Sequence, residues 1–398
     1  MNKIFNRNFS RSLFLYFIAI CFMGLNLYVS LFAMVLIFIN DTVQSKVRFR
    51  IDACFVVLMV SVLLFSRTGI GTGRVSVHNA LWLTSFSFLS YTIGRNMIAK
   101  CRTWSDVYVL WFFIFLILAL PNIPITLYDV LVNGLVNPER ALAVAGDESD
   151  QRAVTGRTIE LAMAISGIFM VFIPSKIADI KKTRQYYIIL AVVAEICTLH
   201  YVSRTGVALL VIAFILGLLF LSGISRRTVA AMLAVAVLYY LLQNTAIVGV
   251  FADREIEGSD MASAGGRSSR WLLGLTMLFA NPSGYSIFEM RYVHNFWLDY
   301  GMEGGLYAFL LMVLFSIMGL WKVVVLYFKK VAPDYVSVSA LIFTILFIAS
   351  IFTEPIHKGS PAMMYTYFLF TAMVVELCRQ VKSGHLRFNN SSKTFQKK

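Results

Sequence analysis

The chain has 398 residues, of which 59% are apolar and only 14% are charged. Soluble domains carry about 25% charged residues, so this composition excludes a soluble globular protein and predicts a polytopic membrane protein. The low counts of glycine, proline and cysteine exclude collagen-like, disordered and disulfide-stapled chains.

Apolar runs recur along the whole chain, and a helix needs roughly 20 apolar residues to cross about 30 Å of hydrocarbon. The first run, 12–39, is long for one helix and short for two. The later runs lie at 52–66, 79–98, 105–123, 157–174, 186–202, 205–223, 228–250, 303–328, 335–352 and 362–380.

Loop charges decide how the first run crosses, because Lys and Arg in short loops mark the cytoplasmic side. Basic clusters before and after 12–39 place both flanks in the cytoplasm, so this run is predicted to be a hairpin that turns near Gly24 and Asn26. The sequence therefore predicts a single all-α integral membrane domain over 1–398 with about twelve spans. Both termini are then cytoplasmic, including a polar tail at 381–398.

The formal net charge of +14 would suggest a nucleic-acid partner in a soluble chain. In the predicted topology, however, cytoplasmic segments hold 24 of the 35 basic residues and only 6 of the 21 acidic ones. The excess charge is therefore topogenic. It predicts membrane lipid as its neighbour and no nucleic acid.

Two outer segments are long enough to carry function, at 124–156 and 251–302. The first is acidic and is predicted as a solvated loop or part of a lid. The second contains glycine and proline breakers and a predicted helix from Arg267 to about Ala280. The main outer segment is thus expected to be partly helical and to precede the third-last span.

The basic residues on the outer side are almost all arginines, whereas the cytoplasmic side holds 13 lysines and 11 arginines. Arginine binds phosphate bidentately through its planar guanidinium, which favours a lipid-linked phosphate or pyrophosphate as ligand. The plainer interpretation is that arginines end helices at the interface. The outer basic residues are Arg67, Arg74, Arg140, Arg152, Arg157, Arg204, Arg254, Arg267, Arg270, Arg291 and Lys358.

Three of these arginines have a more specific context. Arg204 lies between two apolar runs with no room for a loop, where a charge is costly unless it faces protein or water. Arg267 and Arg270 are three residues apart and would share one face near the N-terminus of the predicted helix, where backbone N–H groups also favour anions.

His294 is the candidate general base, because a neutral imidazole can accept a proton from a sugar hydroxyl near pH 7. It follows Arg291 closely and precedes a span that is predicted to begin around Glu303. The alternative is an ordinary hydrogen-bonding histidine at the interface, and Glu289, Asp299 and Glu303 are rival bases. Walker A, G-x-G-x-x-G, C-x-x-C, H-E-x-x-H and G-x-S-x-G patterns are missing, so neither a metal nor a cofactor is expected.

Five short segments occur in an order that resembles the bacterial O-antigen polymerase and O-antigen ligase superfamily. They are Ser203-Arg204-Thr205-Gly206, Gly265 to Trp271, Asn281-Pro282-Ser283-Gly284, His294-Asn295, and Gly301 with Gly304-Gly305. The resemblance covers about 200–310. It departs from the family after Pro282, where the family tends to show two glycines and this chain has Gly284 followed by Tyr285.

The resemblance implies an inverting, metal-independent glycosyl transfer at the periplasmic face of the bacterial inner membrane. An undecaprenyl-pyrophosphate-linked oligosaccharide would be the donor, and a chain-length regulator is a further candidate partner. By resemblance Arg204 and Arg267 would bind pyrophosphate, and His294 would deprotonate or orient the acceptor hydroxyl. Arg270 and Arg291 are added as pyrophosphate ligands from their spacing alone.

The family contains two activities that differ in the acceptor. A polymerase transfers the chain to the next lipid-linked repeat unit, whereas a ligase transfers it to a lipid A core sugar. The short distance in sequence between Trp271 and His294 favours a polymerase. A lipid-linked oligosaccharide flippase is an alternative of another class, but such a transporter should show internal repeats and charges deep in its spans.

Overall fold

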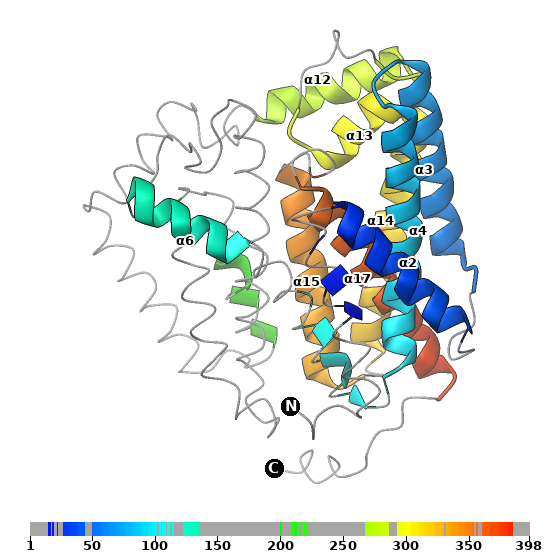
Figure 1. The fold of residues 1–398 in the computed structure, drawn as a ribbon, viewed down its shortest axis with the longest axis vertical. Coiled ribbons are helices and arrows are strands. Elements are labelled where there is room, and N and C mark those ends of the chain that lie inside the picture. Colours follow the sequence, from blue (N-terminus) through cyan, green and yellow to red (C-terminus); the bar gives the residue numbers. More distant parts are fainter. Residues whose placement is uncertain are drawn as a thin grey trace.

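The computed structural model describes residues 27–43, 50–101, 122–134, 267–285, 293–329, 332–353 and 360–384. It also describes short pieces between 15 and 22, 103 and 114, and 200 and 220, and residue 356. Within these ranges every regular element is a helix and none is a strand (Figure 1). The all-α prediction is therefore confirmed for this part of the chain.

Four helices are long and apolar enough to cross a membrane, which confirms the membrane character of the protein. They are α3 (Ala53–Gly71), α14 (Leu306–Phe328), α15 (Asp334–Thr353) and α17 (Pro361–Lys382).

Two further helices pack with them. The helix α4 (Val77–Ala99) has 23 residues but a more polar composition, and most of its residues from Phe86 to Ile98 are buried. The helix α2 (Leu27–Val43) begins directly after the predicted hairpin turn and has 17 residues. The total of twelve spans stays a prediction, because the runs at 157–174 and 228–250 and almost all of 186–202 lie outside the described residues.

The helices α4 and α17 run in parallel at the centre of the bundle. Phe86 stacks on Tyr365 near the start of both helices, and the Gln380 side chain donates to the Ile98 carbonyl near their other ends. Their backbones approach closely at Gly94, where a Cβ would lie 2.2 Å from the Leu369 carbonyl oxygen. Small residues that allow such an approach are a common basis of helix packing in membranes.

One end of the bundle, called the charged end, is held by ion pairs that are buried or half-buried. Arg95 lies 2.8 Å from the Asp52 carboxylate and 3.2 Å from Glu376, which links α3, α4 and α17. Lys100 lies 2.6 Å from Asp41 of α2. Buried ion pairs of this kind are costly to break, because loss of one partner leaves the other charge unpaired.

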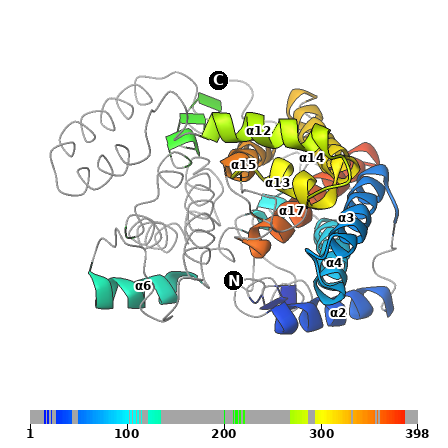
Figure 2. The same cartoon turned by 90° about the horizontal axis from the view of Figure 1, so that it is seen from above.

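The opposite end, called the α13 end, carries two shorter helices. The helix α12 (Arg267–Ala280) has the bounds that the sequence predicts, and it lies across the bundle rather than along it (Figures 1 and 2). Beneath it lies α13 (Phe296–Gly304), which ends at Gly305. The predicted start of the span at 303 is therefore wrong: Glu303 belongs to α13, and the spanning helix begins at Leu306.

Gly305 is the physical reason for this break. Its φ is 85°, in the left-handed region that glycine adopts at little cost, so the α-helical path cannot continue through it.

The predicted outer loop at 124–156 begins as a helix, α6 (Asn122–Asn133). Its Asp129 is fully buried, and one carboxylate oxygen lies 2.7 Å from Nε2 of the buried His200. Residues 135–156 lie outside the described residues. At least the first part of this segment is therefore packed into the protein rather than solvated.

Candidate functional site

His294 sits in a strained turn at the α13 end. Its φ is 56°, the left-handed region that side chains other than glycine seldom occupy. The Asp299 carboxylate accepts a hydrogen bond from the Val293 amide at 2.9 Å and from the Asn295 amide at 3.0 Å. Asp299 therefore holds the backbone on both sides of His294, and the half-buried imidazole projects from a fixed turn. Strain of this kind is often found at functional sites.

Asn295 anchors the same turn to two helices. Its side-chain oxygen accepts from the Leu298 amide at 3.2 Å, which makes Asn295 the N-cap of α13. Its side-chain nitrogen donates to the Phe352 carbonyl at 3.3 Å, near the end of α15. The dipeptide His294-Asn295 is thus fixed relative to a spanning helix.

The helix α12 packs directly on the turn. A Cβ at Gly274 would lie 3.0 Å from the side chain of Val293, the residue before His294. Arg270 lies one helical turn before Gly274 on the same face of α12, and its side chain is exposed. The structure therefore brings the Arg270 face of α12 together with the His294 turn.

The other predicted site residues are only partly described. Arg267 is the first residue of α12, but its side chain lies outside the described residues. Arg204 and Arg291 lie outside them entirely, so their predicted role in pyrophosphate binding stays a prediction.

The Asn281-Pro282-Ser283-Gly284 segment forms a turn that packs against the junction of α13 and α14. The Pro282 carbonyl accepts from the Leu306 amide at 2.9 Å, and the Tyr285 amide donates to the Met302 carbonyl at 2.9 Å. A single glycine with positive φ, Gly284, suffices for this turn. Two of the segments that carry the family resemblance, Asn281 to Gly284 and Gly301 with Gly304-Gly305, are therefore adjacent in space.

An apolar groove of about 590 Å³ lies on one side of α13. Trp297 and Leu298 of α13 line it, and Asn295 lies at its polar margin. The remaining walls come from α12, α14 and α15, and they are almost wholly hydrocarbon and aromatic: Trp271, Leu272, Leu275, Phe309, Val313, Ile317, Leu320, Ile348 and Phe352.

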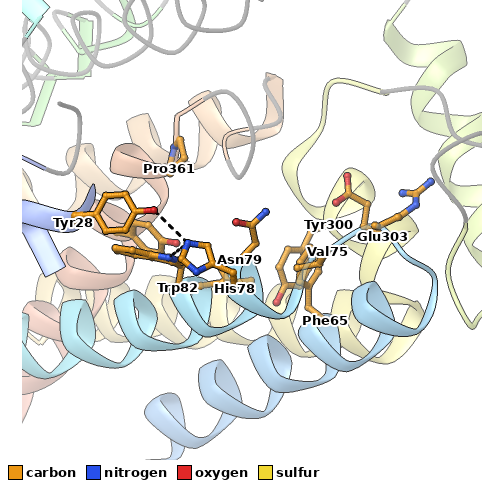
Figure 3. Close-up of a pocket in the computed structure, with 12 residues that line it drawn as sticks. Tyr28, Phe65, Val75, His78, Asn79, Trp82, Tyr300, Glu303 and Pro361 are labelled. Atoms are coloured by element: carbon orange, nitrogen blue, oxygen red, sulfur yellow. Dashed lines mark hydrogen bonds between the residues drawn. The ribbon is translucent and has the colours of Figure 1, made fainter. Parts of the chain in front are cut away.

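A second cavity of about 390 Å³ lies on the opposite face of α13 (Figure 3). Most of its lining is apolar, but charged and hydrogen-bonding groups make up part of its wall, and it is called the polar cavity for that reason. Tyr300 and the fully buried Glu303 line it from α13, and Arg74 lines it from the turn between α3 and α4. Burial raises the pKa of Tyr300, so at neutral pH its phenol is uncharged. The ionisable groups that can give this cavity its charge at neutral pH are thus those of Arg74 and Glu303, with His78 of α4 at the other end.

The sequence named Arg74 as an outer arginine and Glu303 as a rival base, but it did not connect them. It missed the contributions of Tyr28, His78 and Asn79, which come from different helices and follow no motif. The pair His78-Asn79 at the start of an apolar run is the signal that could have indicated them. In the described part of the chain, no group of three or more His, Cys, Asp or Glu side chains could hold a metal ion.

This arrangement can support acid–base chemistry beside an anion site. A half-buried imidazole lies on a backbone turn that Asp299 holds, and an exposed guanidinium lies on the adjoining helix face. Comparison with known proteins adds no relative: no protein-family model matches the chain, and no curated protein matches it significantly.

Proposed function

We propose that the protein is a membrane glycosyltransferase that polymerises a surface polysaccharide from undecaprenyl-pyrophosphate-linked repeat units. The observation that carries this proposal is the strained His294 turn, which Asp299 holds at both flanking amides beside the Arg270 face of α12. Strain at a histidine is costly, and it is understandable where the ring must be aimed at a substrate.

The proposed reaction exchanges one bond at the anomeric carbon of the donor sugar. The C1–O bond to the lipid pyrophosphate breaks, and the acceptor hydroxyl oxygen forms a new bond to C1 from the opposite side. His294 takes the hydroxyl proton, and the electron pair leaves with undecaprenyl pyrophosphate. Arg270, together with Arg204, Arg267 and Arg291, would stabilise the charge that develops on the leaving group, because fixed cations need no reorganisation.

The apolar groove supports a lipid-linked donor. It adjoins Asn295, the neighbour of His294, and its hydrocarbon walls suit an isoprenoid chain rather than a soluble sugar nucleotide. An apolar groove of this kind supports chemistry at the membrane surface, which in the predicted topology would be the outer face of the bacterial inner membrane. The choice of polymerase over ligase rests on the short segment between Trp271 and His294.

The proposal is tested by replacing His294 with Ala in cells that depend on this protein for polymer. We expect loss of long polymer while single repeat units continue to reach the outer leaflet. A matched His385→Ala variant in the C-terminal tail should make polymer of normal length. Normal polymer in the His294→Ala cells would refute the catalytic assignment, and failure of repeat units to reach the outer leaflet would favour a flippase.

A further inference from the structure

The polar cavity on the Glu303 face of α13 combines two kinds of lining. One end is aromatic: the Tyr28 and Trp82 rings meet edge to face with centroids 4.7 Å apart, and His78 lies beside both (Figure 3). Glu303 lies at the other end in the same view, and Arg74 also lines the cavity. Asn79 lies between the two ends in the same view. The cavity therefore offers flat apolar surfaces and directional hydrogen-bonding groups together.

Hydrogen bonds at the aromatic end join three side chains from two helices. The Trp82 indole N–H can only donate, and it donates to Nε2 of His78. The Tyr28 hydroxyl lies 3.5 Å from the same nitrogen. This end of the cavity is consequently both aromatic and polar.

The aromatic wall is rigid because it continues into the core. Trp82 stacks on the buried Phe86 at 5.5 Å, and Phe86 stacks on Tyr365, which also lines the cavity. A ligand that packs on Trp82 would therefore meet a ring already held by the core, and preformed sites lose less entropy on binding.

We propose that this cavity binds a pyranose unit of the acceptor glycan, an inference that rests on the proposed function. A pyranose has apolar C–H faces that pack on aromatic rings, and a rim of hydroxyl groups that bond to carboxylate, amide and guanidinium groups. A hydrocarbon chain fits poorly here, since it would cover the exposed Asn79 amide without offering it a hydrogen bond. The apolar groove on the other face of α13 is the better place for such a chain.

The proposal also explains why the cavity lies apart from His294. Glu303 is in the last turn of α13, whereas His294 precedes the first residue of that helix, Phe296. The helical rise from Phe296 to Glu303 alone is roughly 10 Å. An acceptor of several sugars extends along this distance, whereas a single sugar does not. The cavity is therefore a subsite that holds one sugar of the acceptor while another sugar presents its hydroxyl to His294.

Saturation-transfer NMR on the full chain in lipid nanodiscs tests the subsite without requiring activity. The probes are methyl glycosides of hexoses, 6-deoxyhexoses and 2-acetamidohexoses, with uridine and adenosine as flat aromatic comparators. We expect at least one class of glycoside to receive saturation. Trp82→Ala should reduce its affinity at least tenfold, and Trp82→Phe should retain most of it because the flat ring remains. Asn79→Ala should weaken binding without unfolding, since Asn79 is exposed.

The matched control is Trp321→Ala, which removes a tryptophan that is 63% exposed and lines neither the cavity nor the groove. Binding of nucleosides but not glycosides, binding of no glycoside, or equal affinity in the Trp82→Ala and Trp321→Ala variants would overturn the subsite. If glycosides bind but His294→Ala cells make normal polymer, the proposed function fails and the subsite stands. If His294→Ala abolishes polymer and no glycoside binds, the subsite alone fails.

Discussion

The Asp299 carboxylate accepts hydrogen bonds from the backbone amides on both sides of His294, at 2.9 and 3.0 Å. Asp299 is fully buried and lies in the first turn of α13, whereas His294 precedes that helix. The Asp299 side chain thus stabilises a backbone turn that lies just before the helix to which Asp299 belongs. The sequence named Asp299 as a rival base, but in the structure both of its oxygens bond to backbone groups.

We expect Asp299→Asn to disturb this turn, because an amide offers one acceptor oxygen and would point its NH₂ group at one backbone N–H. Lost hydrogen bonds to a buried charged group predict destabilisation of roughly 3 kcal/mol and a loss of polymer synthesis. Thermal unfolding in detergent and polymer length in cells measure the two effects. The exposed Asp334→Asn on α15 is the control. Full activity in Asp299→Asn would contradict a positioning role.

The strain of the left-handed backbone at His294 can be tested separately from the role of its imidazole. His294→Gly should be more stable than His294→Ala by roughly 1 kcal/mol, because alanine retains the steric cost of positive φ and glycine does not. Both variants should lack polymerase activity, since neither has an imidazole. The comparison of their melting temperatures checks the backbone conformation. An alanine variant that melts at or above the glycine variant would show that the turn is not strained.

Gly305 has a conformational role that hydropathy does not reveal. A Cβ at Gly305 would lie 2.8 Å from the Pro282 carbonyl oxygen, and its φ is 85°. We therefore expect Gly305→Ala to destabilise the junction of α13 and α14 by roughly 1–3 kcal/mol. Gly71→Ala at the end of α3, where a Cβ meets open space, should leave the melting temperature unchanged or slightly raised. Similar melting temperatures for the Gly305→Ala and Gly71→Ala variants would contradict the claim that the turn at Gly305 requires glycine.

The anion site is tested at Arg270, the predicted phosphate ligand whose side chain is described. Arg270→Ala should raise the KM for the lipid-linked donor about tenfold or more, because one charge-assisted hydrogen bond is lost. Arg270→Lys should restore only part of the affinity for the donor, because lysine lacks the planar guanidinium. Arg67→Ala removes another exposed arginine at the same end of the bundle and should leave KM unchanged. An equal change in KM for both variants would point to general surface charge rather than a site.

Sequence patterns predicted the parts of the fold that depend on local properties. Hydropathy located α15 and α17 to within two residues at each end, and glycine and proline breakers located α12. Hydropathy could not find the end of α13 at Gly305, because that break depends on one φ angle. It also ended the span at 52–66 too early, because α3 continues through Arg67 to Gly71.

In the candidate site, too, the sequence could predict residues from local properties but not contacts between distant segments. His294 could be named from its chemistry and from the resemblance, because both are properties of a short segment. The polar cavity could not, since Tyr28, Arg74 and Glu303 come together only when α2, the α3–α4 turn and α13 pack at one end. The buried Arg95–Glu376 pair is another contact between segments far apart in sequence.

Reconstitution in proteoliposomes with purified undecaprenyl-pyrophosphate-linked repeat unit and a metal chelator tests the central claim most directly. The account predicts longer glycans on the carrier lipid, with inverted configuration at the new linkage, and no elongation by His294→Ala. Transfer that occurs only after lipid A core is added would identify a ligase instead. No elongation by the wild-type protein, or equal elongation by His294→Ala, would contradict the account.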